Sequence, residues 1–288
     1  MKKIIFSSLF LFSCVAVGWG QYYRPLEIKG VEDYEAPDSA YLQFTYRLIS
    51  VKDTAQPQLT CEDRQVLQIG KKYSKYFSQY LVDYSEKVAR DIKNGKIKQG
   101  IEANPYSGCY GYEIFKNYPR PGILTYNDIG CFVQFNYTYE EELPVFNWKM
   151  EPGQDTVLGY VCRKATTRFR GRNYTAWFTM QIPISNGPWK FGGLPGLILK
   201  IADARREYVW ECIGMEQSEE QEPIRFYRIP FSKITRKNLA KLYQRFHQDE
   251  AAFNNRIGMI NLQVNEDGST EEFSNSKKEL PYNPIELE

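Results

Sequence analysis

The stretch that most constrains the fold of this chain runs from Gly187 to Ile198 and reads GPWKFGGLPGLI. Four glycines and two prolines in these twelve residues are interleaved with Trp, Phe, Leu and Ile. Flexible linkers with this glycine content lack such apolar side chains, so we expect a shaped turn that is anchored in a core. Strand-like patterns surround this turn, at residues 157–169, 173–184, 197–202 and 207–213.

Alternation of apolar and polar residues predicts further strands. Residues 41–51 place Leu42, Phe44, Tyr46 and Leu48 on one side, which is typical of a strand with one buried face. Other strand-like runs lie at residues 66–69, 73–77, 112–116, 123–126, 131–139 and 224–229.

Two helices are predicted. Residues 85–94 begin at a capping Ser85 and end just before Gly95. Residues 232–253 carry an apolar face. With the strands, these helices predict a mainly β fold, in which an antiparallel meander forms a curved sheet or half-barrel with one or two packed helices.

The first twenty residues are organised like a secretory signal peptide, because Lys2 and Lys3 precede an apolar run over 4–19. Cleavage is expected after Gly20. A lipoprotein signal with an acylated Cys14 is the alternative, which the apolar residues after that cysteine disfavour. No later stretch approaches the roughly 18 apolar residues of a membrane span. We expect an exported protein in the periplasm, associated with the outer membrane, or secreted.

No repeat or Pro/Ser-rich linker divides the chain of 288 residues. After the signal peptide at 1–20 we expect an extended arm over 21–38, because this segment is acidic and contains proline. A single β-rich domain is expected over 39–264. A loose tail is expected over 265–288, since this segment is mostly polar.

The charge balance bears on the partners of the protein. Without Lys2 and Lys3, 35 basic and 35 acidic residues remain, whereas binding to nucleic acid requires a local excess of Lys and Arg. We therefore expect no nucleic-acid partner. The basic run over 163–172 is interrupted by apolar residues, and it fits the solvated face of two strands; an anion-binding strip is the alternative. Gly171 predicts a hairpin turn within it.

The residues of the turn carry a resemblance to a known family. Gly193, Leu194, Pro195, Gly196, Leu197 and Ile198 match the motif that gives the GLPGLI family its name. Residues 158–165, 169–172, 175–179, 182–184 and 187–189 resemble the family's block in order, 67–78 its early segment and 282–287 its usual ending. The resemblance implies an exported Bacteroidetes protein of undefined biochemical role. It supplies no catalytic residues.

Several catalytic motifs are missing from the sequence. His247 is the only histidine, so the chain cannot build the common His-rich zinc site, and a Ser-His-Asp or Cys-His set would have to use this residue. The patterns HExxH, GxSxG, GxGxxG and GxxxxGK do not occur. We expect no metal and no cofactor, and we favour a protein that is not an enzyme.

Five cysteines remain after cleavage, and export favours disulfides. We expect Cys109 to pair with Cys131, and Cys162 with Cys212, because each pair couples segments that a meander would bring together. Cys61 is then left over, either as a small buried side chain or as a reactive thiol.

Two roles are open for the glycine-rich turn. In the first, its glycines permit a tight path while its apolar side chains fill the core. In the second, the turn forms the lip of an apolar cavity that binds a ligand or a partner. The residues expected to line such a site are Trp148, Trp177, Trp189, Phe191 and Leu194.

Asp-Ser/Thr-apolar triplets resemble the sites at which Bacteroidetes attach O-glycans to exported proteins. Thr54 is the best candidate, because it lies in a predicted turn.

Together these features favour a binding protein whose ligand is apolar or amphipathic, or is another envelope protein. A hydrolase or peptidase that serves an outer-membrane transport system is one alternative. A structural or assembly factor is another.

Overall fold

The computed structural model describes residues 33–96, 110–132, 135–257, 262–264, 270–272 and 279–288. Within these residues the chain divides into two compact units. The sheet unit contains the residues up to Lys233 together with Pro284–Glu288, which we call the closing segment. The helical unit spans Ile234–Asn283. Each unit is described by itself, and the single domain that the sequence predicts over 39–264 stays a prediction.

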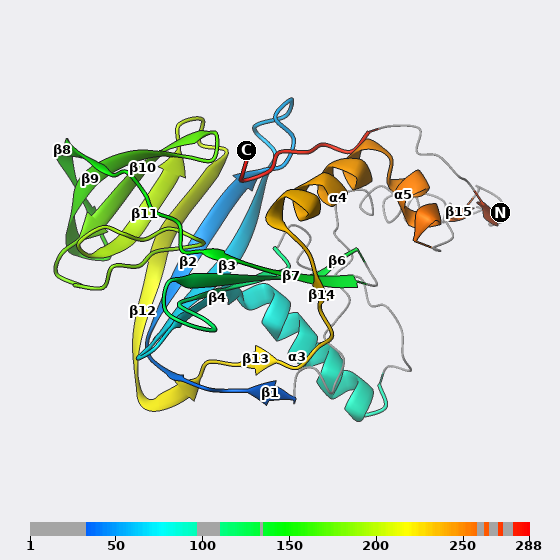
Figure 1. Ribbon diagram of the computed structural model, residues 1–288, viewed down its shortest axis with the longest axis horizontal. Helices are drawn as coiled ribbons and strands as arrows, with labels where there is room; N and C mark the ends of the chain where they lie inside the picture. The colour runs from blue at the N-terminus through cyan, green and yellow to red at the C-terminus, as the bar shows by residue number, and fades with distance from the viewer. Residues whose placement is uncertain (1–32, 97–109, 133–134, 258–261, 265–269, 273–278) are drawn as a thin grey trace, which may run out of the picture. The chain divides into compact units, whose positions relative to one another are not determined.

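A twelve-stranded sheet dominates the sheet unit (Figure 1). Its strands, in sheet order, are β14 (Ser232–Lys233), β7 (Phe135–Glu142), β6 (Ile123–Phe132), β5 (Tyr112–Lys116), β4 (Ser74–Ser78), β3 (Thr60–Gly70), β2 (Ser39–Val51), β12 (Tyr208–Pro223), β11 (Leu197–Asp203), β10 (Arg172–Thr179), β9 (Tyr160–Phe169) and β8 (Lys149–Val157). Neighbours are antiparallel except β14 and β7. The predicted mainly β fold with an antiparallel meander is confirmed; the sheet is not closed into a barrel.

The sheet consists of two meanders. Strands β2 to β7 follow one another across one part, and β8 to β12 follow one another across the other. β2 joins them, because it pairs with β3 on one side and with β12 on the other. The burial pattern of β2 agrees with the predicted alternation, because Phe44, Tyr46 and Leu48 are fully buried.

Smaller elements complete the sheet unit. β1 (Tyr34–Glu35) pairs with β13 (Phe226–Tyr227), so the end of the predicted extended arm is held in a short sheet. α3 (Gln79–Lys93) contacts β3. Its cap is Ser78, whose hydroxyl accepts the Leu81 N–H, and not Ser85 as predicted. Ser85 lies inside the helix, where its hydroxyl donates to the Leu81 carbonyl. Serine forms local bonds both at the start of a helix and within it, so its presence alone does not locate the start.

The strand predicted over 131–139 is wrong. Phe132 ends β6 and pairs with Phe135, the first residue of β7, so this stretch turns the chain back on itself. Apolar residues continue on both sides of the connection at 133–134, which lies outside the described residues, and the sequence therefore carries no break in its pattern.

The helical unit contains α4 (Arg236–Gln248), α5 (Glu250–Arg256) and the pair β15 (Leu262–Val264) and β16 (Thr270–Glu272). The single helix predicted over 232–253 breaks at Asp249. This residue adopts an extended conformation, and its carboxylate accepts the Ala252 N–H as the cap of α5. In the part of the chain that the structure describes, no helix is both long and apolar enough to cross a membrane.

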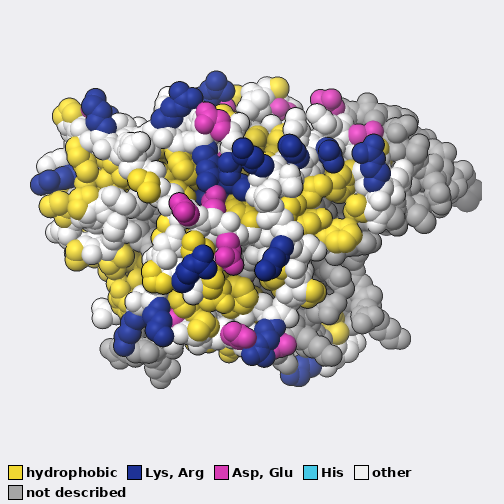
Figure 2. Space-filling view, viewed as in Figure 1, with side chains coloured by type: hydrophobic (Ala, Val, Ile, Leu, Met, Phe, Trp, Pro, Cys, Tyr) yellow, Lys and Arg dark blue, Asp and Glu magenta, His cyan; other side chains and the backbone are white. Residues whose placement is uncertain are grey.

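On the face seen in Figure 2, Lys and Arg groups are interspersed with acidic and apolar side chains.

The core contains side chains of both meanders and of the glycine-rich turn. Its largest fully buried side chains include Trp210, Tyr46, Tyr76, Tyr174, Tyr208 and Phe191.

Candidate functional site

The glycine-rich turn follows a path that two of its glycines permit. A Cβ atom on Gly196 would lie 2.1 Å from the Thr179 carbonyl oxygen, so no other residue fits there without a shift of the backbone. Gly193 has a φ of +83°, a conformation that side chains disfavour. Backbone bonds from Leu197 N–H to Ile182 O (3.0 Å) and from Ile198 N–H to Asn186 O (3.0 Å) return the chain to β11.

A buried lysine holds the inner side of this turn. Lys116 of β5 donates from Nζ to Asn186 Oδ1 at 2.8 Å, to Gly187 O at 2.9 Å and to Phe191 O at 2.6 Å. All three acceptors are neutral. Burial lowers the pKa of Lys116 well below its usual value, since removal from water disfavours the charged form.

The residues predicted to line an apolar site separate into two groups. Trp189, Phe191 and Leu194 are at most 2% exposed and pack into the core. Trp148 is partly buried beside them, and its indole N–H donates to Gly192 O at 2.8 Å. Trp177 of β10 is also partly buried and packs against the same core cluster. Three of the five residues are thus core side chains, and the other two lie against that core.

The turn between β9 and β10 presents two arginines. Arg170 and Gly171 both have positive φ, at 44° and 83°, which confirms the predicted two-residue hairpin turn. Arg172 begins β10 and is 5% exposed. Its Nη1 contacts Asp203 Oδ2 at 3.1 Å and Glu207 Oε2 at 2.6 Å. The predicted solvated face is therefore wrong for Arg172, which is buried among acidic partners.

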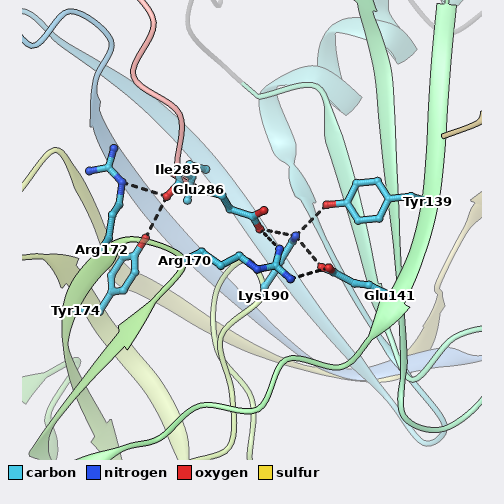
Figure 3. A network of polar contacts seen from close by, with 8 residues as sticks. All are labelled: Tyr139, Glu141, Arg170, Arg172, Tyr174, Lys190, Ile285 and Glu286. Atoms are coloured by element: carbon cyan, nitrogen blue, oxygen red, sulfur yellow. Dashed lines mark hydrogen bonds and ion pairs between the residues drawn. The ribbon is translucent and has the colours of Figure 1, made fainter. Parts of the chain in front are cut away.

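The closing segment lies against this turn (Figure 3). Arg172 donates from Nη2 to Pro284 O at 2.7 Å and from Nε to Ile285 O at 3.0 Å. The Leu287 N–H donates to Arg170 O at 3.0 Å. Three backbone groups of the closing segment are thus hydrogen-bonded to the turn. Residues 284–288 of the predicted tail are therefore not loose.

One carboxylate of the closing segment enters a buried charged cluster. Lys190 Nζ contacts Glu286 Oε1 at 2.5 Å, and Arg170 Nη1 contacts the same oxygen at 2.7 Å. Glu141 of β7 faces the same two cations, at 2.8 Å from Lys190 and 2.7 Å from Arg170. Lys190 also donates to the Tyr139 hydroxyl at 2.8 Å. Figure 3 shows Lys190 and Arg170 between the two carboxylates.

The cluster keeps Glu286 ionised despite its burial. Burial alone would raise the pKa of this carboxyl, but Lys190 and Arg170 together hold the pKa below its usual value. Burial lowers the pKa of Lys190, and the two carboxylates oppose that shift. The site can therefore hold one acidic side chain and the main chain on either side of it.

Sequence reasoning missed this site. Arg170 and Arg172 lie in the basic run for which the sequence favours a solvated face over an anion-binding strip. Lys190 lies inside the glycine-rich motif, which the sequence analysis interprets from its glycines and apolar residues alone. Glu286 fell in the predicted loose tail. The one usable signal was the match of residues 282–287 to the usual ending of the GLPGLI family.

The disulfide predicted between Cys162 and Cys212 is not confirmed, since both are free thiols in the structure. β10 and β11 separate their strands in the sheet. Each sulfur donates to a nearby backbone oxygen, from Cys162 Sγ to Tyr160 O at 3.5 Å and from Cys212 Sγ to Gly214 O at 3.3 Å. Burial raises their pKa values to about 11 and about 12, which makes both poor nucleophiles.

The other cysteines leave part of the prediction open. Cys61 is a free thiol and is partly exposed. Cys109 and the side chain of Cys131 lie outside the described residues, so the bond between them stays a prediction.

Two further candidates have clear positions. Thr54 is exposed in the turn between β2 and β3, where the Asp53 carboxylate accepts the Ala55 N–H. His247 lies near the end of α4, with Nδ1 at 2.7 Å from Tyr243 O and its ring packed on Tyr282. The residues of the signal peptide, 1–20, lie outside those that the structure describes.

Comparison with known proteins gives a family match over the same region. The model of a Bacteroidetes-associated family described as "Protein of unknown function (Porph_ging)" matches residues 170–200. These residues include Arg170, Arg172, Lys190 and the glycine-rich turn. No curated protein matches the chain.

Two similar solved structures are crystal forms of PNGF-II. The form in space group P21 has a TM-score of 0.48 and 12% identity, and it covers 73% of this chain and 34% of that chain. The form in space group C2 has a TM-score of 0.46 and 14% identity, and it covers 72% and 33%. This chain thus spans about a third of the PNGF-II chain, and at these scores the likeness carries no functional argument.

Proposed function

We propose that this chain is an exported envelope protein of the GLPGLI type that binds a partner protein without catalysing a reaction. Export is proposed from the signal-like sequence over residues 1–20. The binding site proposed is the cluster of Arg170, Arg172 and Lys190, which already holds a peptide segment of the chain itself.

The contacts of Arg172 support this function most directly. Its guanidinium takes two successive backbone carbonyls, those of Pro284 and Ile285, and backbone groups are common to every peptide. A site that grips main chain in this way suits an extended segment of another protein.

The packing of the glycine-rich turn favours a protein partner over an apolar ligand. Trp189, Phe191 and Leu194 are already in contact with the core, so they offer no surface to a second apolar molecule.

Site-specific photo-crosslinking in envelopes of the native host tests this function. A benzoylphenylalanine at Arg168, which is exposed beside the site, should give an adduct with another envelope protein. The same probe at Leu59, which is 54% exposed in the turn between β2 and β3, is the matched control. Equal adducts at both positions, or only intramolecular adducts with residues 284–288, would contradict the proposal.

A further inference from the structure

We infer that this site reads an extended segment in which an apolar residue is followed by glutamate, and that the closing segment is the resident ligand which a partner's segment must displace. The inference rests on the proposed function and adds the chemistry of the ligand and the competition within the chain.

The main chain of the ligand is fixed at three points. Arg172 bonds to the carbonyls of residues 284 and 285, and the N–H of residue 287 bonds to Arg170 O. Gly171 leaves room for this approach, because a Cβ atom on it would lie 2.7 Å from the Leu287 Cβ. These contacts set the register of the segment but do not depend on its side chains.

Two side chains carry the selectivity. Ile285 packs against the hydrophobic core, and Glu286 is bound by Lys190 and Arg170. A neutral or basic residue in place of Glu286 would face the buried Lys190 and the partly buried Arg170, each with fewer partners. This costs more than the loss of an exposed pair. Glu288 contributes little, because its pair with Arg168 is 3.3 Å long and both side chains are more than 60% exposed.

The charges of the body favour an acidic ligand. Ion pairs at this site join four cations, Arg170, Arg172, Lys190 and Arg205, to three carboxylates of the body, Glu141, Asp203 and Glu207. A fifth cation, Arg168, pairs with Glu288 of the closing segment. The closing segment adds Glu286 and Glu288, so that positive and negative charges are equal in number. A ligand without acidic side chains would leave two positive charges unmatched.

Arg170, Arg172 and Lys190 keep acidic neighbours when the segment leaves, although the site then has two more positive than negative charges. Lys190 and Arg170 retain Glu141, and Arg172 retains Asp203 and Glu207. Displacement therefore strands no buried cation, and exchange of one acidic segment for another is compatible with a folded body.

A peptide-binding measurement on the full chain tests the inference. The released variant carries Ile285→Asp and Glu286→Lys, which remove the side-chain contacts of the closing segment. The probe is a fluorescein-labelled peptide with the sequence of residues 282–288, and binding is followed by fluorescence anisotropy. We expect saturable binding to the released variant, and at least tenfold weaker binding to the native chain, where the closing segment competes.

Variants of the peptide separate its two acidic positions. Replacement of Glu286 by Gln in the peptide should weaken binding to the released variant at least tenfold. The matched control, Glu288→Gln, should weaken it less than threefold. Equal binding of both peptides would overturn the selectivity while leaving the site as a peptide binder.

The remaining outcomes are also decisive. A released variant that is folded by circular dichroism and binds none of these peptides would overturn the inference, whereas the photo-crosslinking result would still decide the proposed function separately.

If the released variant does not fold, the full chain with Glu286→Gln alone takes its place. That single variant should bind the native peptide at least threefold more tightly than the native chain does, and no gain would overturn the competition.

Discussion

Two carboxylates of the sheet unit, the buried Asp63 and the partly buried Glu286, have opposite electrostatic environments. Asp63 is 1% exposed and accepts bonds from the Ser78 hydroxyl (2.7 Å), the Gln65 amide (2.9 Å) and the Tyr110 N–H (3.0 Å). These donors are neutral, and burial raises the pKa of Asp63 to about 6. Glu286 faces two cations, and its pKa lies below the usual value. The charge of the partners, and not burial alone, therefore decides whether the pKa of a carboxyl is raised or lowered.

The same contrast separates two buried lysines. Lys116 has three neutral oxygen acceptors, whereas Lys190 has two carboxylates and a hydroxyl. Burial lowers both pKa values, but only Lys190 has carboxylates that oppose the shift. Lys116 therefore serves as a hydrogen-bonding clamp on the glycine-rich turn, while Lys190 belongs to a charged site that can bind and release an acidic group.

The largest effect is expected for Lys190→Met. This change leaves Glu141 and Glu286 with Arg170 alone in a buried place, so the free energy of unfolding should fall by about 3 kcal/mol. Urea unfolding measures this loss. Lys200→Met is the matched control, because Lys200 forms a partly exposed pair with Asp155 and should cost less than about 1 kcal/mol. Equal losses in the two variants would contradict the contrast.

A pH titration of stability should distinguish Asp63 from Glu286. The pKa of Asp63 is about 6 in the folded chain, whereas that of the free carboxyl is 3.8. Stability from this group is therefore full below pH 3.8 and falls as pH rises through about 6, by up to about 1.4 kcal/mol per pH unit in between. Asp63→Asn should flatten this slope in urea unfolding series.

Glu286 should give the opposite slope at lower pH. Its pKa is lowered from 4.5, so its contribution is present above pH 4.5 and is lost as pH falls further. Glu286→Gln should remove that loss and leave the slope between pH 4.5 and about 6 unchanged. A change of the Asp63 slope in this variant would show that the two clusters are coupled.

A smaller effect is expected for Lys116→Met. The change removes the Lys116 donor from Gly187 O and Phe191 O, and one of the two donors of Asn186 Oδ1, which should lower stability by about 2 kcal/mol. Hydrogen exchange should become faster over residues 186–198 and stay unchanged in α3. Lys233→Met, at an exposed position of β14, is the control. Uniformly faster exchange would argue against a local clamp.

The smallest effect is expected for Arg168→Ala. Its pair with Glu288 is exposed on both sides, so the free energy of unfolding should change by less than about 0.5 kcal/mol. Thermal unfolding would reveal a larger loss, which would mean that the exposed end of the closing segment matters as much as Glu286.

Local features of the sequence predicted most of the fold. The period-two pattern located β2 and β5, and the positive φ of Gly171 located the hairpin between β9 and β10. Errors occurred where a side chain could serve either of two local structures. The sequence predicts Ser85 as a cap and predicts none at Asp249, although both side chains bond to nearby backbone groups.

The candidate site depended on contacts between distant parts of the chain. Lys190 and Glu286 are 96 residues apart, and Arg172 is 113 residues from Ile285. Nothing local distinguishes Lys190, which is 1% exposed in its side chain, from the exposed Lys233. No periodic pattern marked the closing segment, because five residues held by backbone bonds and one carboxylate need no alternation.

The sequence by itself determined the strands, the hairpin turn and the tight path of the glycine-rich motif, since each depends on steric limits within a few neighbouring residues. Only the tertiary structure decided which cations meet which carboxylates, and therefore that the pKa of Glu286 is lowered while that of Asp63 is raised to about 6. The physical reason is that the free energy of a buried charge depends on partners within a few ångströms, whatever their distance along the chain.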